Sequence, residues 1–189
     1  MAVTTFVDEN FIERADDPDG LVTSIARQAL TLANLRRRFE ENPTDSLHAD
    51  IGRALQRLSE WKRLAGDYQE ALALKDEAIA VWAALGREKA RTLTQLQKAE
   101  TQHLLGDPVS AYKRFDHLIT RLKGNDELSI YLDFAYEWLA RCQIRDGLVL
   151  EALDSMSECL VLREKRGNAT QLAYTRELVE RMAALVPSA

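Results

Sequence analysis

The spacing of glycine and proline constrains the fold of this sequence more than any other feature. The chain has 189 residues with only 8 glycines and 4 prolines, roughly half the usual share. Most of them mark intervals of 18 to 23 residues, at Gly20, Pro43, Gly66, Gly86, Gly106, Gly124, Gly147, Gly167 and Pro187. Glycine commonly follows the last turn of a helix, and proline cannot continue one. The spacing therefore predicts helices of similar length, separated by short turns.

Residues that start helices follow these breaks. Asp67, Asp107 and Asn168 each come directly after a glycine, and Pro108 follows Asp107; both residue types are typical of helix N-termini. Hydrophobic residues make up 46% and charged residues 29% of the chain, which is an ordinary globular balance. The sequence predicts an all-α fold of about eight helices, at 21–41, 45–65, 67–85, 87–105, 107–122, 126–145, 148–166 and 168–186.

Residues 1–20 differ from the rest of the chain. They hold six acids and one base, Arg14, and so carry the whole formal charge of −5. We expect an acidic lead-in that is solvated, with a short helix around Phe6 to Ile12. The alternative is that Phe6, Phe11 and Ile12 dock against the first pair of helices.

An internal repeat with a period of 40 and then 41 residues connects three of the glycines. Gly66, Gly106 and Gly147 are each followed five residues later by an alanine. A small residue there lets the two helices of a hairpin approach closely, and an apolar pair one to two turns further on is expected to face the core. The residues concerned are Ala71, Ala111 and Ala152, followed by Ala78-Ile79, Leu118-Ile119 and Cys159-Leu160.

This pattern resembles the tetratricopeptide repeat (TPR) family, in a variant with repeats of about 40 residues. The resemblance implies an α-solenoid of antiparallel helix hairpins that form a right-handed superhelix. It predicts a single domain over 21–189, with full repeats at about 46–85, 87–122 and 126–166. Helix 21–41 would then be the second helix of an incomplete repeat, with its inward-facing residues at Ala26, Ala29, Leu30 and Ala33. Helix 168–186 would close the stack.

The same resemblance implies a concave wall made by four positions of each first helix. They are Arg53, Gln56, Glu60 and Arg63, then Leu93, Leu96, Glu100 and His103, then Phe134, Glu137, Arg141 and Ile144. The chaperone-docking members of the family hold a terminal carboxylate with Lys, Asn and Arg. Here Gln56, Glu60, Phe134 and Trp138 stand at those positions, which excludes that mode of binding.

We therefore expect a non-catalytic scaffold or adaptor that binds a peptide or helix segment of a protein in its groove. Two alternatives remain: a regulatory module that senses peptides, and a structural module that assembles with itself, as a homodimer through helix 168–186. A pI near 5.3 argues against a nucleic-acid partner. No apolar run is long enough for a membrane span, and the start does not read as a secretory signal, so we expect a cytoplasmic protein.

Few residues of this sequence suggest chemistry, and none forms a familiar catalytic set. Glu100 and His103 have the Glu-x-x-His spacing of di-iron bundles, but the required second copy is missing. Cys142 and Cys159 are expected to be small buried hydrophobes. The sequence predicts no enzyme activity, no metal and no cofactor.

Overall fold

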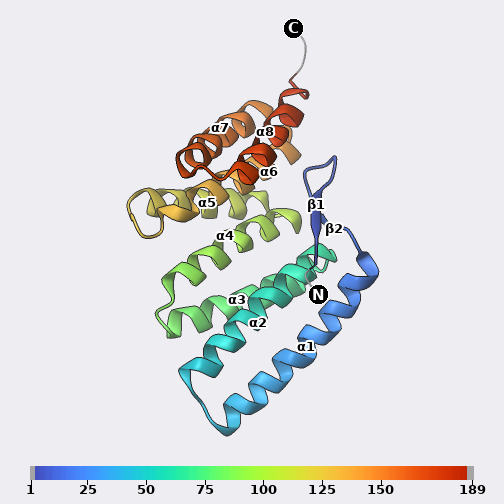
Figure 1. The fold of residues 1–189 in the computed structure, drawn as a ribbon, viewed down its shortest axis with the longest axis vertical. Coiled ribbons are helices and arrows are strands. Elements are labelled where there is room, and N and C mark those ends of the chain that lie inside the picture. Colours follow the sequence, from blue (N-terminus) through green and yellow to red (C-terminus); the bar gives the residue numbers. More distant parts are fainter. Residues whose placement is uncertain (1–2, 187–189) are drawn as a thin grey trace. The chain divides into compact units, whose positions relative to one another are not determined.

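The computed structural model describes residues 3–186, and most of them are helical (Figure 1). The elements are β1 (Thr5–Val7), β2 (Glu13–Ala15), α1 (Pro18–Glu41), α2 (Asp45–Leu64), α3 (Tyr68–Ala84), α4 (Glu88–Leu104), α5 (Pro108–Lys123), the short 3₁₀ helix η1 (Ser129–Tyr131), α6 (Leu132–Arg145), α7 (Val149–Arg166) and α8 (Ala169–Ala183). The all-α class is confirmed, with eight α-helices in the described residues. Residues 1–2 of the predicted acidic lead-in and residues 187–189 of the predicted repeat domain lie outside the described residues.

The helix ends lie where local sequence places them. The side chains of Thr44, Asp107 and Asn168 each accept a hydrogen bond from a backbone N–H in the first turn of the helix that follows. Gly66 and Gly147 adopt positive φ angles of 86° and 76°, a conformation that costs other residues free energy. The predicted boundaries are therefore correct to within a few residues for seven of the eight helices.

The chain forms two compact units, Met1–Gly106 and Asp107–Ala189. In the first unit, consecutive helices pack on one another: α1 on α2, α2 on α3, and α3 on α4 (Figure 1). Buried apolar side chains join these helices, among them Leu32, Leu55, Leu58, Leu74 and Trp82. Each helix therefore buries its apolar face against the next helix in sequence.

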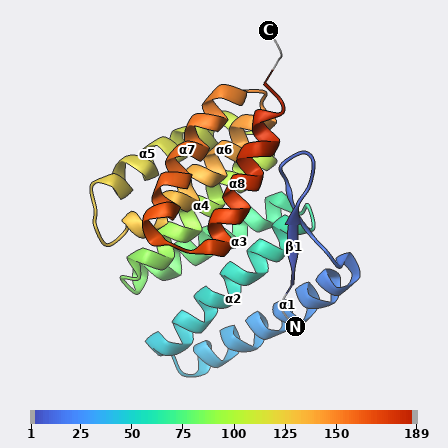
Figure 2. The ribbon, with the colours of Figure 1, turned by 45° about the horizontal axis from the view of Figure 1, so that its top comes forward.

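The second unit is built in the same way. Helix α5 packs on α6, α6 on α7, and α7 on α8 (Figure 2). Its buried side chains include Phe115, Leu118, Met156, Leu178 and Met182. Helix pairing between sequence neighbours is the packing of a solenoid, in which each element contacts its neighbours.

The residues that define the internal repeat occupy equivalent environments. Ala71, Ala111 and Ala152 are all completely buried. Seven residues later, Ala78, Leu118 and Cys159 are exposed by 2% or less. The register of 40 and 41 residues read from the sequence therefore matches the burial pattern of all three second helices.

The helix expected around residues 6–12 is wrong, because this segment is a β-hairpin. Thr5–Val7 pairs antiparallel with Glu13–Ala15. One carboxylate oxygen of Asp8 accepts hydrogen bonds from the N–H groups of Asn10 and Ile12, both at 2.9 Å. Burial alone would raise the pKa of Asp8, but the hydrogen bonds from Ile12 and Arg14 outweigh it and hold the pKa below its usual value. An aspartate side chain that binds nearby backbone groups competes with helix formation.

The tip of this hairpin contains Phe11, which has a φ of 56° and is 4% exposed. A positive φ is unusual for a bulky residue. Phe6 is half exposed, and Ile12 is partly buried. Of the three apolar side chains considered for docking, only Phe11 is buried.

The inward face of α1 also differs from the prediction. Leu30 is 68% exposed, and Ala26, Ala29 and Ala33 are exposed as well. The inward stripe is instead spaced alternately by four and three residues, at Leu21, Ile25, Gln28, Leu32, Leu35 and Phe39. These side chains are larger and bury more apolar area than the alanines, so they determine which face packs on α2.

The last difference lies before α6. The predicted helix 126–145 is interrupted, and η1 occupies Ser129–Tyr131 ahead of α6. The side chain of Asn125 accepts a hydrogen bond from the N–H of Leu128 at 3.1 Å, and the hydroxyl of Ser129 donates to the carbonyl of Asp126 at 2.8 Å. These local bonds stabilise a tighter turn than an α-helix would have.

Candidate functional site

The twelve residues predicted for a concave wall have different degrees of exposure. Arg53 is exposed. Four others are partly buried: Gln56, Glu60, Leu93 and Phe134. The remaining seven are buried: Arg63, Leu96, Glu100, His103, Glu137, Arg141 and Ile144. Most of the charged members therefore interact with the protein itself.

A cluster of buried and partly buried charges lies at the C-terminal half of α2 in the first unit. This α2 cluster consists of Glu13, Ser59, Glu60, Arg63, Lys75 and Glu100. Its members come from β2, α2, α3 and α4, so it links four elements of the unit. Buried charges are costly unless they are paired, and here each cation lies beside at least one carboxylate.

Arg63 is the centre of the α2 cluster, with a side chain only 3% exposed. Its Nη2 lies 2.6 Å from Oε2 of Glu13, and its Nε lies 3.1 Å from Oε2 of Glu60. Its Nη1 lies 3.9 Å from Oε2 of Glu100. Burial alone would lower the pKa of Arg63, but the three carboxylates outweigh it and raise the pKa. The guanidinium is therefore a fixed positive charge that organises three acids.

Lys75 is completely buried and donates to Glu60 and, at 3.4 Å, to the hydroxyl of Ser59. Burial would raise the pKa of Glu60, but the charges of Lys75 and Arg63 outweigh this effect and lower it. Burial lowers the pKa of Lys75, because the charge of Glu60 offsets only part of the lost hydration. Glu60 therefore holds its negative charge between two cations.

The second unit contains a similar arrangement at α6. This α6 cluster consists of Asp133, Glu137, Arg141, Arg163, Arg166, Tyr174 and Thr175. It draws on α6, α7 and α8. The side chain of Asp133 has no exposed area, and those of Arg163 and Glu137 are 2% and 7% exposed.

Arg163 uses three of its nitrogens within the α6 cluster. Its Nε lies 3.1 Å from Asp133, its Nη2 lies 2.5 Å from Glu137, and its Nη1 donates to the hydroxyl of Thr175 at 2.7 Å. Burial would lower the pKa of Arg163, but the charge of Glu137 and the hydrogen bonds outweigh it and raise the pKa. Arg166 closes the arrangement with a contact of 2.6 Å to Asp133.

Phe134 lies beside this cluster. Its ring centroid is 5.9 Å from that of Trp138, and the guanidinium of Arg163 is 5.6 Å from the Phe134 centroid. An aromatic ring held by a neighbouring ring and a cation has a restricted orientation. Phe134 is thus a partly accessible, pre-positioned apolar side chain.

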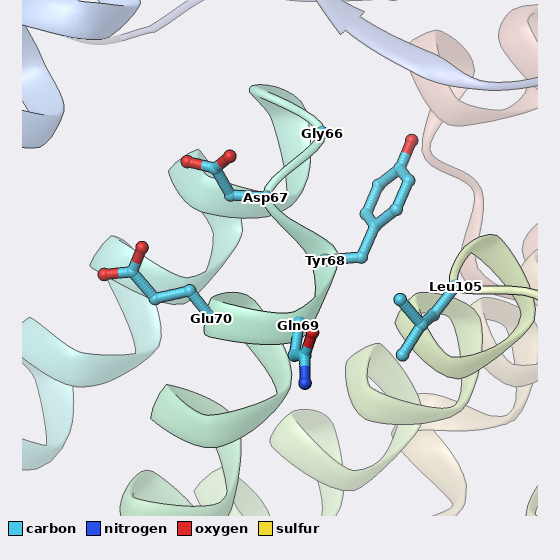
Figure 3. Close-up of a pocket in the computed structure, with 6 residues that line it drawn as sticks. All are labelled: Gly66, Asp67, Tyr68, Gln69, Glu70 and Leu105. Carbon is cyan, nitrogen blue, oxygen red and sulfur yellow. The ribbon is translucent and has the colours of Figure 1, made fainter.

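Each unit has a hollow on its surface. In the first unit, a pocket of about 360 Å³ lies at the turn between α2 and α3. Figure 3 shows the Tyr68 ring on the side of Leu105, while Asp67 and Glu70 point away from it. Both acids contact the ammonium of Lys62, at 3.0 and 2.7 Å.

The second hollow, of about 420 Å³, lies between α5 and α6. Its lining is Tyr112, Asp116, Ile119, Lys123, Tyr136, Leu139, Gln143 and Leu148. The ammonium of Lys123 is 5.6 Å from the centroid of the Tyr136 ring. None of the twelve predicted site residues lines either hollow.

Sequence reasoning did not identify Glu13, Lys75, Asp133 and Arg163 as members of a site. For two of them a signal was present, since Lys75 and Arg163 each interrupt the apolar face that begins at Ala71 or Ala152. A charged residue on a buried face requires a partner. The partners lie on other elements. Glu60 is 15 residues from Lys75 along the chain, and Asp133 and Glu137 are 30 and 26 residues from Arg163.

Cys142 and Cys159 are both buried free thiols, as expected. Burial raises the pKa of the Cys159 thiol to about 12. Among residues 3–186, no group of three or more His, Cys, Asp or Glu side chains is placed to hold a metal ion. Within the same range, no helix has the length and apolarity that crossing a membrane requires.

Comparison with known proteins gives no relative: no family model matches the chain, and no curated protein or solved structure matches it.

Proposed function

We infer that this protein is a non-catalytic scaffold of the TPR-like class, which binds a segment of another protein along the first helices of its hairpins. The observation that carries the inference is the repetition. Ala71, Ala111 and Ala152 are buried equivalently, each five residues after a glycine at a turn. Repeated helical hairpins present extended binding surfaces, so the repetition supports a binding role.

The accessible members of the predicted wall supply the chemistry for such binding. Arg53 is exposed, and Gln56, Leu93 and Phe134 are partly exposed. The first unit thus offers a cation, an amide and an apolar side chain, and the second unit offers an aromatic ring. Side chains of these kinds suit an extended peptide or a helix with alternating apolar and charged groups. The α2 and α6 clusters support this role, because ion pairs with neighbouring elements hold the wall residues Arg63 and Glu137 in place.

The test begins with peptides selected by display against the purified chain, whose affinities are then measured by calorimetry. Leu93→Ala and Phe134→Ala each remove an accessible apolar side chain from a first helix. Truncation of an interface anchor costs more than about 1 kcal/mol, so each substitution is expected to weaken binding by about fivefold or more. Val161→Ala is the matched control, because Val161 is 47% exposed on the second helix α7.

Unchanged affinity in both Leu93→Ala and Phe134→Ala would refute the assignment of the binding face. Equal losses in the Val161→Ala control would do so as well. Arg141 is 2% exposed and is unsuitable for this test, because its removal would destabilise the fold.

A further inference from the structure

The N-terminal hairpin occupies part of the face that the proposed function assigns to a partner. Glu13 of β2 reaches Arg63 in the last turn of α2, and Arg63 is one of the twelve predicted wall residues. The contact is 2.6 Å from Oε2 of Glu13 to Nη2 of Arg63. Figure 1 shows the hairpin beside the C-terminal end of α2. A segment from the acidic end of the chain therefore already binds there.

The hairpin is a small element. Its strands contain three residues each, and an isolated two-stranded hairpin is marginally stable at best in water. The second carboxylate oxygen of Glu13 accepts a hydrogen bond from the hydroxyl of Thr5 at 2.8 Å, so Glu13 joins the two strands to each other and to α2. Elements of this kind open at a lower free energy than the helical core.

The charges of the α2 cluster define what can replace Glu13. Glu60 lies beside both Arg63 and Lys75, and Glu100 lies 3.9 Å from Arg63. Glu13 is a third carboxylate on an arginine that remains charged. A replacement group that also brings one carboxylate leaves the charge of the cluster unchanged, whereas a neutral group loses a charge-assisted hydrogen bond.

We propose that Arg63 anchors a binding site for an extended acidic segment of a partner protein, and that the N-terminal hairpin is its internal occupant. The partner exchanges its own carboxylate for that of Glu13. This proposal rests on the proposed function and adds to it the chemical class of the partner and a means of regulation.

The exchange has a thermodynamic consequence that a purely structural hairpin lacks. A tethered occupant competes at a high effective concentration. The apparent dissociation constant of a partner therefore equals the intrinsic one divided by the fraction of molecules with the site open. Weakening the hairpin contact should tighten partner binding. If the hairpin only caps the fold, the same change would affect stability and leave affinity constant.

The experiment uses a fluorescent peptide with the sequence of residues 3–16, added to the full chain and measured by anisotropy. Glu13→Gln in the chain keeps the shape of the side chain and removes its charge. It is expected to tighten binding of the peptide by about tenfold, which corresponds to the loss of one charge-assisted hydrogen bond. The same substitution in the peptide is expected to weaken its binding to the Glu13→Gln chain by a similar factor.

Glu9→Gln in the chain is the matched control. It removes the same charge from an exposed position of the hairpin and should leave the affinity unchanged. A second readout is hydrogen exchange in residues 4–16, which should become faster in Glu13→Gln and not in Glu9→Gln. This readout and the affinity comparison do not depend on any substitution at the buried Arg63.

Equal affinity of the peptide for the wild-type and Glu13→Gln chains would overturn the proposal. An equal gain in the Glu9→Gln chain would overturn it too, because the effect would then be general repulsion between acids. Either result leaves the proposed function standing if display-selected peptides still lose affinity in Leu93→Ala and Phe134→Ala. If, in addition, the affinity of display-selected peptides is unchanged in Leu93→Ala and Phe134→Ala, the proposed scaffold function is refuted as well.

Discussion

Replacement of Arg163 tests whether the α6 cluster holds the second unit together. Arg163→Met keeps most of the aliphatic volume and removes the guanidinium, whose side chain is 2% exposed. The change leaves Asp133 and Glu137 without their shared cation and Thr175 without its donor. Removing one partner from a buried ion pair costs about 3–5 kcal/mol.

The structure favours the lower end of this range. Asp133 retains Arg166 at 2.6 Å, and Glu137 retains Arg141 at 3.6 Å. We therefore expect Arg163→Met to lower the free energy of unfolding by about 3 kcal/mol. The assay is urea unfolding followed by circular dichroism, with hydrogen exchange to show that the loss is concentrated in α6 to α8.

Two further variants sharpen the result. Arg176→Met breaks an ion pair with Glu164 in which the side chains are 60% and 49% exposed, and exposed pairs contribute only about 0–1 kcal/mol. Arg163→Met combined with Glu137→Leu replaces the buried pair with apolar groups and should recover part of the loss. A cost below about 1 kcal/mol for Arg163→Met, or a double variant at least as unstable as the sum of its parts, would refute the reasoning.

Three other substitutions test separate features of the fold, each by chemical denaturation. Gly147→Ala places a side chain at a φ of 76° and should lower the free energy of unfolding by about 1 kcal/mol. Gly124→Ala, at a φ of −89°, is the control and should be neutral or slightly stabilising. Equal effects of the two substitutions would contradict the role of the positive φ at the turn. Gly52→Ala brings a Cβ to 2.7 Å from the ring of Trp82 and should lower the free energy of unfolding by about 1–3 kcal/mol. Trp82→Phe in the same chain should recover part of this loss. No loss in Gly52→Ala would show that the Trp82 ring moves aside without cost. Because the pKa of Cys159 rises to about 12 on folding, the unfolded chain loses this proton first, and stability should fall as the pH rises above about 8.5. Cys159→Ala should make that fall less steep by about 1.4 kcal/mol per pH unit, and identical pH profiles would exclude the assignment.

The number of helices and nearly all their ends could be predicted from the sequence, because they depend on local interactions. Gly66 and Gly147 end helices through a backbone conformation that glycine adopts readily, and Thr44, Asp107 and Asn168 bind backbone groups within three residues of themselves. The register of the repeat could also be predicted from the sequence, because the small residue five positions after each turn glycine is visible in a single sequence.

Which helix faces are buried, and which charged side chains pair with each other, depends on contacts between elements that are distant in the sequence. On α1, two apolar stripes compete, and the stripe with Leu32 and Phe39 packs on α2 while Leu30 stays exposed. At the N-terminus, Asp8 closes a hairpin where a short helix was expected around residues 6–12. Which stripe packs depends on the surface that the neighbouring helix offers.

The candidate site shows the same division. The positions of Arg63 and Glu137 on the first helices followed from the repeat, but their partners did not. Glu13 is 50 residues from Arg63, and Arg163 is 26 residues from Glu137. A charged residue on a buried helix face requires a partner of opposite charge. Only the folded chain shows which carboxylate lies close enough to be that partner.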